Sequence, residues 1–227
     1  MSSSLEGKFS MGRLTSNISQ SKVKMPSASP EDMLMQSIMV HQTENVRIVV
    51  LHGDVNEHTI SHVVVQLLQL ANQNHKPIHL VISTYGGSVD EMFSLYDTIK
   101  FLPCPVHTIA LGKVMSAGVL LLASGVKGKR LIGRSARIMI HPISGGLYGN
   151  VFEAMNEVKE HERLQSLMTD ALQKETKMSR DEIEKIMKAG HDYYLTPEEA
   201  IKMGIVDGYI GDNPLDAGVS KKKSKKV

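Results

Sequence analysis

Three short stretches of the chain hold residue types that could perform acyl transfer. Ser116 stands among small residues before an apolar run, where the Ala117 amide and the helix dipole would favour negative charge beside a nucleophile. His141 closes an apolar segment and could serve as a general base. The adjacent Gly86 and Gly87 could turn a backbone N–H group toward an oxyanion. Taken singly, each has a plainer explanation as a helix cap, a rim histidine or a tight turn.

The elements around these residues follow a repeating strand–helix order. The segment 46–51 (VRIVVL) is continuous and β-branched, which predicts a strand buried on both faces. Similar patterns predict strands at 77–83, 106–111 and 136–141, and helices at 58–71, 88–101 and 115–124. The strands begin about every 30 residues, which is the length of one strand–helix unit. We therefore predict an α/β fold of repeated βαβ units around a parallel sheet.

In such a sheet the three stretches would meet. The glycine turn follows the second predicted strand, Ser116 the third and His141 the fourth, and the carboxyl ends of parallel strands share one edge. A histidine that activates a serine needs an acid to orient its ring. Asp192, shortly before a helix start at Thr196, is a candidate by position. The combination favours a Ser–His–Asp arrangement, although no single stretch does.

The remainder of the chain shows where the domain ends. A long helix is predicted over 151–174, and Ser179 and Thr196 each precede a glutamate by three residues, as in capping boxes. We expect three parts: an N-terminal extension that is flexible or processed over 1–34, one domain over 35–212, and a basic tail over 213–227.

Charge is distributed unevenly along the 227 residues. Residues 221–226 hold five lysines, whereas residues 31–219 hold 17 basic and 23 acidic residues, so the net charge of +2 comes from the ends. An acidic body argues against nucleic acid as a partner. The longest apolar run, 117–126, is about half a membrane span, so we expect no membrane association. A cytoplasmic location is expected, with a Ser-rich organelle transit peptide at the N-terminus as the alternative.

Several motifs in order along the chain resemble one family. They are Ser83–Gly87 with Leu95–Ile99, Gly112–Gly118, Ala123–Arg130, Arg137–His141 and Asp192–Asp207. This pattern covers roughly residues 35–212 and is similar to the proteolytic subunits of ATP-dependent Clp proteases, the ClpP family. The resemblance implies a ClpP/crotonase-type fold in which the helix 151–174 projects as a handle.

The resemblance also implies roles for individual residues. Ser116 matches the nucleophile, His141 the general base, Asp192 the orienting acid, and Gly87 and Ala117 the two backbone donors of the oxyanion hole. It implies a serine endopeptidase that degrades unfolded polypeptides and needs no metal or organic cofactor. Its subunits would form heptameric rings stacked in pairs as a tetradecamer, fed by an AAA+ unfoldase that uses the ATP.

Departures from the family pattern fall near the site. Ala117 stands where the family usually has Met, Pro142 stands where the family has Gln followed by Pro, and His191 replaces an Arg. The N-terminal segment does not match the family's axial loop. Two other functions are compatible with the same superfold: a crotonase-like acyl-CoA enzyme and a non-catalytic ring subunit. A Ser–Lys dyad that uses Lys113 is a further alternative for the mechanism.

Overall fold

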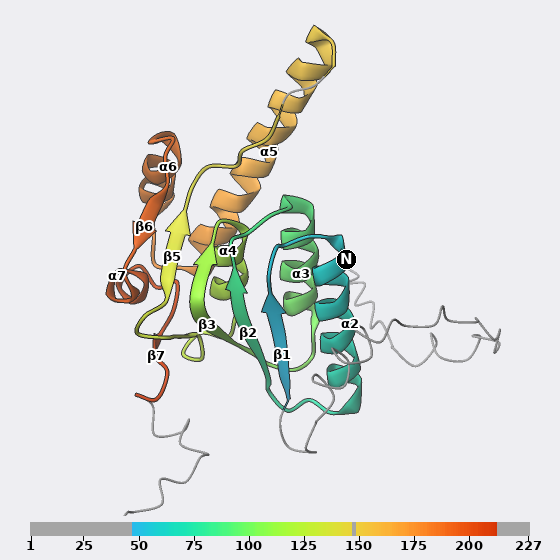
Figure 1. The fold of residues 1–227 in the computed structure, drawn as a ribbon, viewed down its shortest axis with the longest axis vertical. Helices are drawn as coiled ribbons and strands as arrows, with labels where there is room; N and C mark the ends of the chain where they lie inside the picture. The colour runs from blue at the N-terminus through green and yellow to red at the C-terminus, as the bar shows by residue number, and fades with distance from the viewer. Residues whose placement is uncertain (1–46, 147–148, 213–227) are drawn as a thin grey trace, which may run out of the picture. The chain divides into compact units, whose positions relative to one another are not determined.

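The fold is built on one seven-stranded sheet, seen in a computed structural model that describes residues 47–146 and 149–212. Figure 1 shows this arrangement. The strands are β1 (Ile48–His52), β2 (Ile78–Thr84), β3 (Val106–Met115), β4 (Leu131–Ile132), β5 (Arg137–Ile140), β6 (Tyr193–Leu195) and β7 (Gly208–Tyr209). The helices are α2 (Glu57–Gln73), α3 (Val89–Phe101), α4 (Ala117–Ala123), α5 (Val151–Glu175), α6 (Arg180–Lys188) and α7 (Pro197–Lys202). The predicted α/β class is confirmed.

The sheet is parallel except at one strand. Its order is β1-β2-β3-β4-β7, while β5 pairs with β3 and β6 pairs antiparallel with β5. The ten-residue β3 is long enough to serve two neighbours, because Ile109 and Ala110 pair with β4 while Lys113–Met115 pair with β5. The carboxyl ends of β3 and β5 therefore lie side by side, which is the edge where the sequence places Ser116 and His141.

One expectation about β1 is wrong. Val49 and Leu51 are fully buried, but Ile48 and Val50 are 46% and 45% exposed. The alternation arises because α2 packs on β1 from one side of the sheet, as Figure 1 shows. In the described residues, β1 is therefore a strand with one buried face and not a fully buried one.

The predicted helix starts were accurate where a capping residue marks them. Ser179 and Thr196 each cap a helix with a glutamate at the third position, as expected. The helix expected over 115–124 begins only at Ala117, because Met115 still belongs to β3 and Ser116 forms the turn between them. Strands as short as β4, β6 and β7 were not predicted, since two or three residues carry no periodic signal.

Helix α5 has an exposed first part, and its last turns are buried in the core. Its last turns are buried at Met168 and Leu172, whereas its first turns carry Val151 and Phe152 at 72% and 78% exposure. Figure 1 shows this first part extending away from the sheet. The predicted long helix is thus present, and the structure gives its bounds as Val151–Glu175.

A buried ion pair fixes the other end of the sheet. The Arg130 guanidinium, 3% exposed, donates to both carboxylate oxygens of Asp207 at 2.9 and 2.6 Å and to the Glu175 carbonyl at 2.7 Å. Burial raises the pKa of Asp207, but the hydrogen bonds and charge of Arg130, with the Gly128 N–H group, outweigh it and hold that pKa below its usual range. The pair joins β4 to the end of α5 and to the segment before β7.

Candidate active site

Ser116 lies in the turn between β3 and α4 with an unusual backbone. Its φ of 53° is the one positive value among the non-glycine residues that the structure describes. Such a conformation is strained for a residue with a side chain, and it presents the hydroxyl on a sharp strand-to-helix turn. Ser116 occupies the N-cap position of α4, yet its side chain makes no capping hydrogen bond. The plain explanation as a helix cap therefore does not account for this serine.

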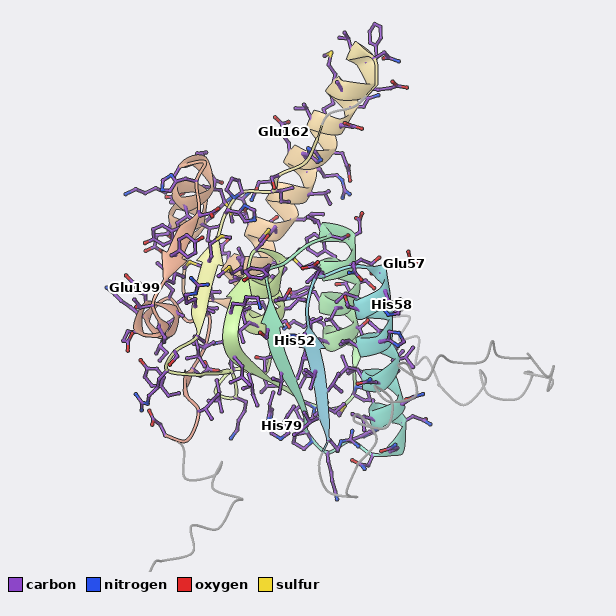
Figure 2. The ribbon with its side chains drawn as sticks, viewed as in Figure 1. His52, Glu57, His58, His79, Glu162 and Glu199 are labelled. Atoms are coloured by element: carbon purple, nitrogen blue, oxygen red, sulfur yellow. The ribbon has the colours of Figure 1, made fainter. Side chains whose placement is uncertain are left out.

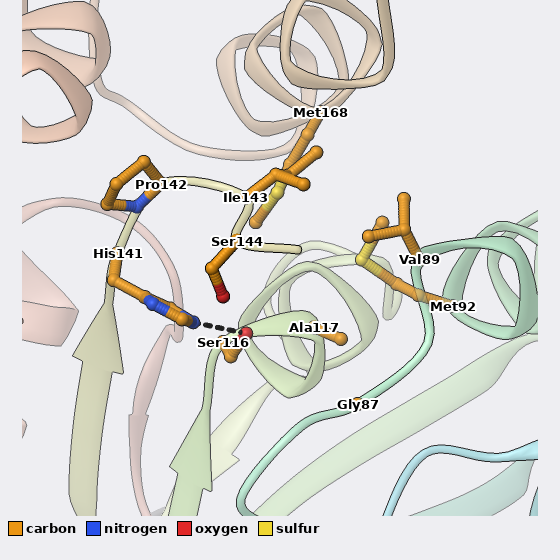
Figure 3. Close-up of a pocket in the computed structure, with 10 residues that line it drawn as sticks. All are labelled: Gly87, Val89, Met92, Ser116, Ala117, His141, Pro142, Ile143, Ser144 and Met168. Carbon is orange, nitrogen blue, oxygen red and sulfur yellow. Dashed lines mark hydrogen bonds between the residues drawn. The ribbon is translucent and has the colours of Figure 1, made fainter. Parts of the chain in front are cut away.

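The Ser116 hydroxyl meets His141 instead. The distance from Ser116 Oγ to His141 Nε2 is 2.7 Å, and Figure 3 shows the contact. Pairing of Met115 with Met139 and a hydrogen bond from Ser116 N–H to the Met139 carbonyl (2.8 Å) bring the ends of the two strands together. For Nε2 to accept the serine proton, the neutral ring must carry its own proton on Nδ1. The structure thus brings together two of the predicted residues in the geometry of a nucleophile and its base.

The glycine turn after β2 is held against the same site. Gly86 and Gly87 have φ values of 102° and 147°, and the Gly86 N–H group donates to Thr84 Oγ1 at 2.9 Å. Val55 clamps the turn from outside, because its N–H group donates to the Gly86 carbonyl and its carbonyl accepts from Ser88 N–H, both at 2.8 Å. Thr84 belongs to the predicted turn, but its hydrogen bond to Gly86 was not predicted. Val55 was not predicted at all, since only the folded chain brings it beside the turn.

Two backbone donors remain available beside Ser116. Across residues 47–146 and 149–212, no hydrogen bond is described for the N–H groups of Gly87 and Ala117. Both residues line the cavity that Ser116 and His141 also line. Two uncommitted donors near a nucleophile are what an oxyanion hole requires. Their assignment to that role remains a prediction.

The cavity itself is small, and both polar and apolar groups line it. It measures about 40 Å³, and Figure 3 shows the residues around it. Its walls come from four separate segments of the chain, and the apolar residues among them are Val89, Met92, Ala117, Pro142, Ile143 and Met168. No lysine or carboxylate belongs to this lining.

Asp192 lies beside the pair without joining it. Ile140 pairs with Tyr193 across β5 and β6, so the next antiparallel position places Asp192 opposite His141. The Asp192 carboxylate is exposed and accepts a hydrogen bond from the Tyr194 hydroxyl at 3.2 Å. Among the contacts described for these residues, none runs from Asp192 to His141. The position is compatible with an orienting acid, and that role stays a prediction.

The Lys113 alternative has less support. The Lys113 ammonium lies 4.4 Å from the centre of the Tyr85 ring, a cation–π contact, and Lys113 does not line the cavity.

Within the described part of the chain, no group of three or more His, Cys, Asp or Glu side chains is placed to hold a metal ion. No described helix has both the length and the apolar character to cross a bilayer.

A serine–histidine pair at the edge of a largely parallel α/β sheet is an arrangement typical of serine hydrolases. The Clp protease family model matches residues 32–213 of the chain. The chain is also 36% identical over 173 residues to the ATP-dependent Clp protease proteolytic subunit of Deinococcus radiodurans, covering 76% of this chain and 84% of that protein. The chain therefore belongs to the Clp protease family and is a serine-type peptidase, which confirms the predicted resemblance and enzyme class.

Proposed function

We propose that this chain is an endopeptidase that cleaves unfolded polypeptides through an acyl-enzyme on Ser116. The observation that carries the proposal is the 2.7 Å contact between Ser116 Oγ and His141 Nε2. His141 takes the hydroxyl proton as Ser116 attacks the peptide carbonyl carbon, and the resulting oxyanion accepts hydrogen bonds from the N–H groups of Gly87 and Ala117. Protonated His141 then gives the proton to the leaving amine. Water, deprotonated by His141, hydrolyses the ester and restores Ser116.

Asp192 completes the proposed mechanism. Its place opposite His141 in the β5–β6 register supports a carboxylate that accepts a hydrogen bond from His141 Nδ1–H. In this arrangement Asp192 exchanges its bond with the Tyr194 hydroxyl for one with the imidazole. A carboxylate there holds the ring in the required tautomer and stabilises the imidazolium.

Assembly is the second part of the proposal. The exposed Val151, Phe152 and Met155 on the projecting part of α5 support a surface that another copy of the chain covers. We propose heptameric rings stacked through α5 into a tetradecamer, with the active sites inside a chamber. An AAA+ unfoldase would supply extended polypeptide and consume the ATP, so this chain itself would need no cofactor. We further propose a cytoplasmic location; the extension 1–34, on which the organelle alternative rests, lies outside the described residues.

Covalent labelling tests the proposed nucleophile. A fluorophosphonate should label the wild-type chain at Ser116, and the Ser116→Ala variant should neither be labelled nor cleave a fluorogenic peptide. His141→Ala should lose nearly all labelling, since the hydroxyl then has no base. An acyl-CoA enzyme that uses only the two amides would hydrolyse no peptide and would not be labelled. Absence of labelling in the assembled wild-type protein would reject the peptidase mechanism.

A further inference from the structure

The segment 142–146, which follows His141, forms one wall of the site without regular secondary structure. Pro142, Ile143 and Ser144 line the cavity, and Figure 3 shows the Ser144 side chain directed toward the Ser116–His141 pair. A segment of this kind keeps its place only through contacts with its neighbours. Among the described residues, a single hydrogen bond reaches its backbone: Ile143 N–H donates to Gln165 Oε1 at 2.8 Å.

Helix α5 holds this segment at two points. Gln165 lies on α5, and His161 lies one turn earlier on the same side of the helix. His161 packs so closely on Gly145 that a Cβ atom there would come within 2.8 Å of the His161 ring. Glu162, labelled in Figure 2, marks this turn of the helix. The segment therefore lies along α5 with one hydrogen bond and one tight contact.

The chemistry of Gln165 indicates which of its atoms is used. Its Nε2 is buried with no hydrogen-bond partner, which is unfavourable. A leucine or methionine would fill similar space without burying an unpaired donor, so the amide oxygen is the part of the side chain that the segment needs. Ile143 has an N–H group to donate because the proline that follows His141 stands at position 142. A proline at 143, as in the family pattern, would have no N–H group to offer.

We propose that Gln165 is a positioning residue that sets the substrate-binding wall through Ile143. This inference rests on the proposed peptidase function. Gln165 does not line the cavity with Ser116 and His141, so it acts on how a peptide is held beside Ser116. Loss of the amide oxygen frees Ile143 and Ser144 to move, which weakens peptide binding while the Ser116–His141 contact persists.

The test compares Gln165→Leu with Gln165→Glu in the full chain. The glutamate keeps an oxygen that accepts from Ile143 N–H, whereas the leucine removes it. We expect Gln165→Leu to raise KM for a fluorogenic peptide about five- to tenfold, with kcat changed less than about threefold. Gln165→Glu should restore KM to within about twofold of wild type. Gln173→Leu is the matched control, since Gln173 is exposed on the same helix, and it should leave KM unchanged.

Fluorophosphonate labelling of Ser116 separates the possible failures. We expect the labelling rate of Gln165→Leu to stay within about twofold of wild type, because the small probe does not need the wall. Three results would each overturn the inference. They are an unchanged KM in Gln165→Leu, an equal rise in KM in Gln165→Leu and Gln165→Glu, and a fall in the labelling rate of Gln165→Leu that parallels its loss of peptide cleavage. Gln165→Met, which better matches the glutamine shape, replaces the leucine variant if the latter fails to fold. Failure of wild type to be labelled would instead overturn the proposed function.

Discussion

Replacing Gly87 by alanine is the most direct perturbation of the proposed oxyanion hole. At its φ of 147°, a Cβ atom would collide with the Val55 carbonyl. That carbonyl cannot simply retreat, because it accepts the Ser88 N–H hydrogen bond at 2.8 Å. The turn must therefore move, and the Gly87 N–H group moves with it, away from its present place beside the cavity.

The expected magnitude follows from the loss of one donor. Removing a single oxyanion donor lowers kcat by about 100- to 1000-fold in serine hydrolases, so Gly87→Ala should fall in this range. Stability should also fall by about 2–3 kcal/mol, from the strain of a side chain at positive φ and the loss of about one hydrogen bond. KM should change less than kcat, because the ground-state carbonyl carries little charge.

Gly53→Ala is the control that separates strain from collision. Gly53 has a φ of 100°, but a Cβ atom there would meet nothing within 4 Å. It should lose about 1 kcal/mol of stability with kcat unchanged. Both variants are compared by thermal unfolding, particle mass and kcat on a fluorogenic peptide. A folded Gly87→Ala enzyme with kcat within threefold of wild type would refute the assignment of Gly87.

Three further substitutions test other parts of the site and fold. Asp192→Asn should lower kcat by about 10³- to 10⁴-fold if the carboxylate sets the His141 tautomer. The pH dependence of kcat is measured for both enzymes, and a kcat for Asp192→Asn equal to that of wild type across the pH range would exclude that role. Lys113→Met should keep kcat within about twofold, whereas a Ser–Lys dyad would lose activity. Asp207→Asn should cost about 2–3 kcal/mol of stability, measured by denaturant unfolding, because the buried Arg130 loses the negative charge that balances its own. Folding lowers the pKa of Asp207, so the contribution of its carboxylate to stability is present above about pH 4 and is lost as the pH falls through the folded-state pKa. The stabilities of the wild type and of Asp207→Asn, plotted against pH, should therefore converge in acid. A difference that stays constant with pH would contradict this reasoning.

The order of the longer helices and strands was predictable because each of them has a hydrophobic pattern in the sequence. The helix that begins at Glu57 and the strand that begins at Ile78 appear in the sequence as apolar residues at spacings of 3.6 and 2. Caps at Ser179 and Thr196 fixed two helix starts to the residue. The exposure of Ile48 was not predictable, since a run of β-branched residues has the same pattern whether one face or both are covered.

The sequence predicted that Ser116 and His141 lie close together, but not the backbone conformation of Ser116 or the contacts around the pair. A sheet edge shared by Ser116 and His141 follows from strand order alone. The positive φ of Ser116 does not, because a serine before an apolar helix has the same sequence signature whether it caps the helix or turns away from it. Gln165 was missed for a different reason: its partner is a backbone N–H group on a segment without regular structure, and no spacing relates the two.

The antiparallel direction of the short strand β6 decides where Asp192 lies relative to Ser116 and His141. The parallel strands β3 and β5 end at the edge where Ser116 and His141 lie. Asp192 precedes Tyr193, the first residue of β6, so a parallel β6 would place the carboxylate at the opposite edge. Reversal of the strand brings its beginning to the end of β5, and the pairing of Ile140 with Tyr193 then sets Asp192 opposite His141. The direction of a three-residue strand therefore decides whether Asp192 lies beside His141, and a one-residue slip in that register would direct the neighbouring side chains to the other face.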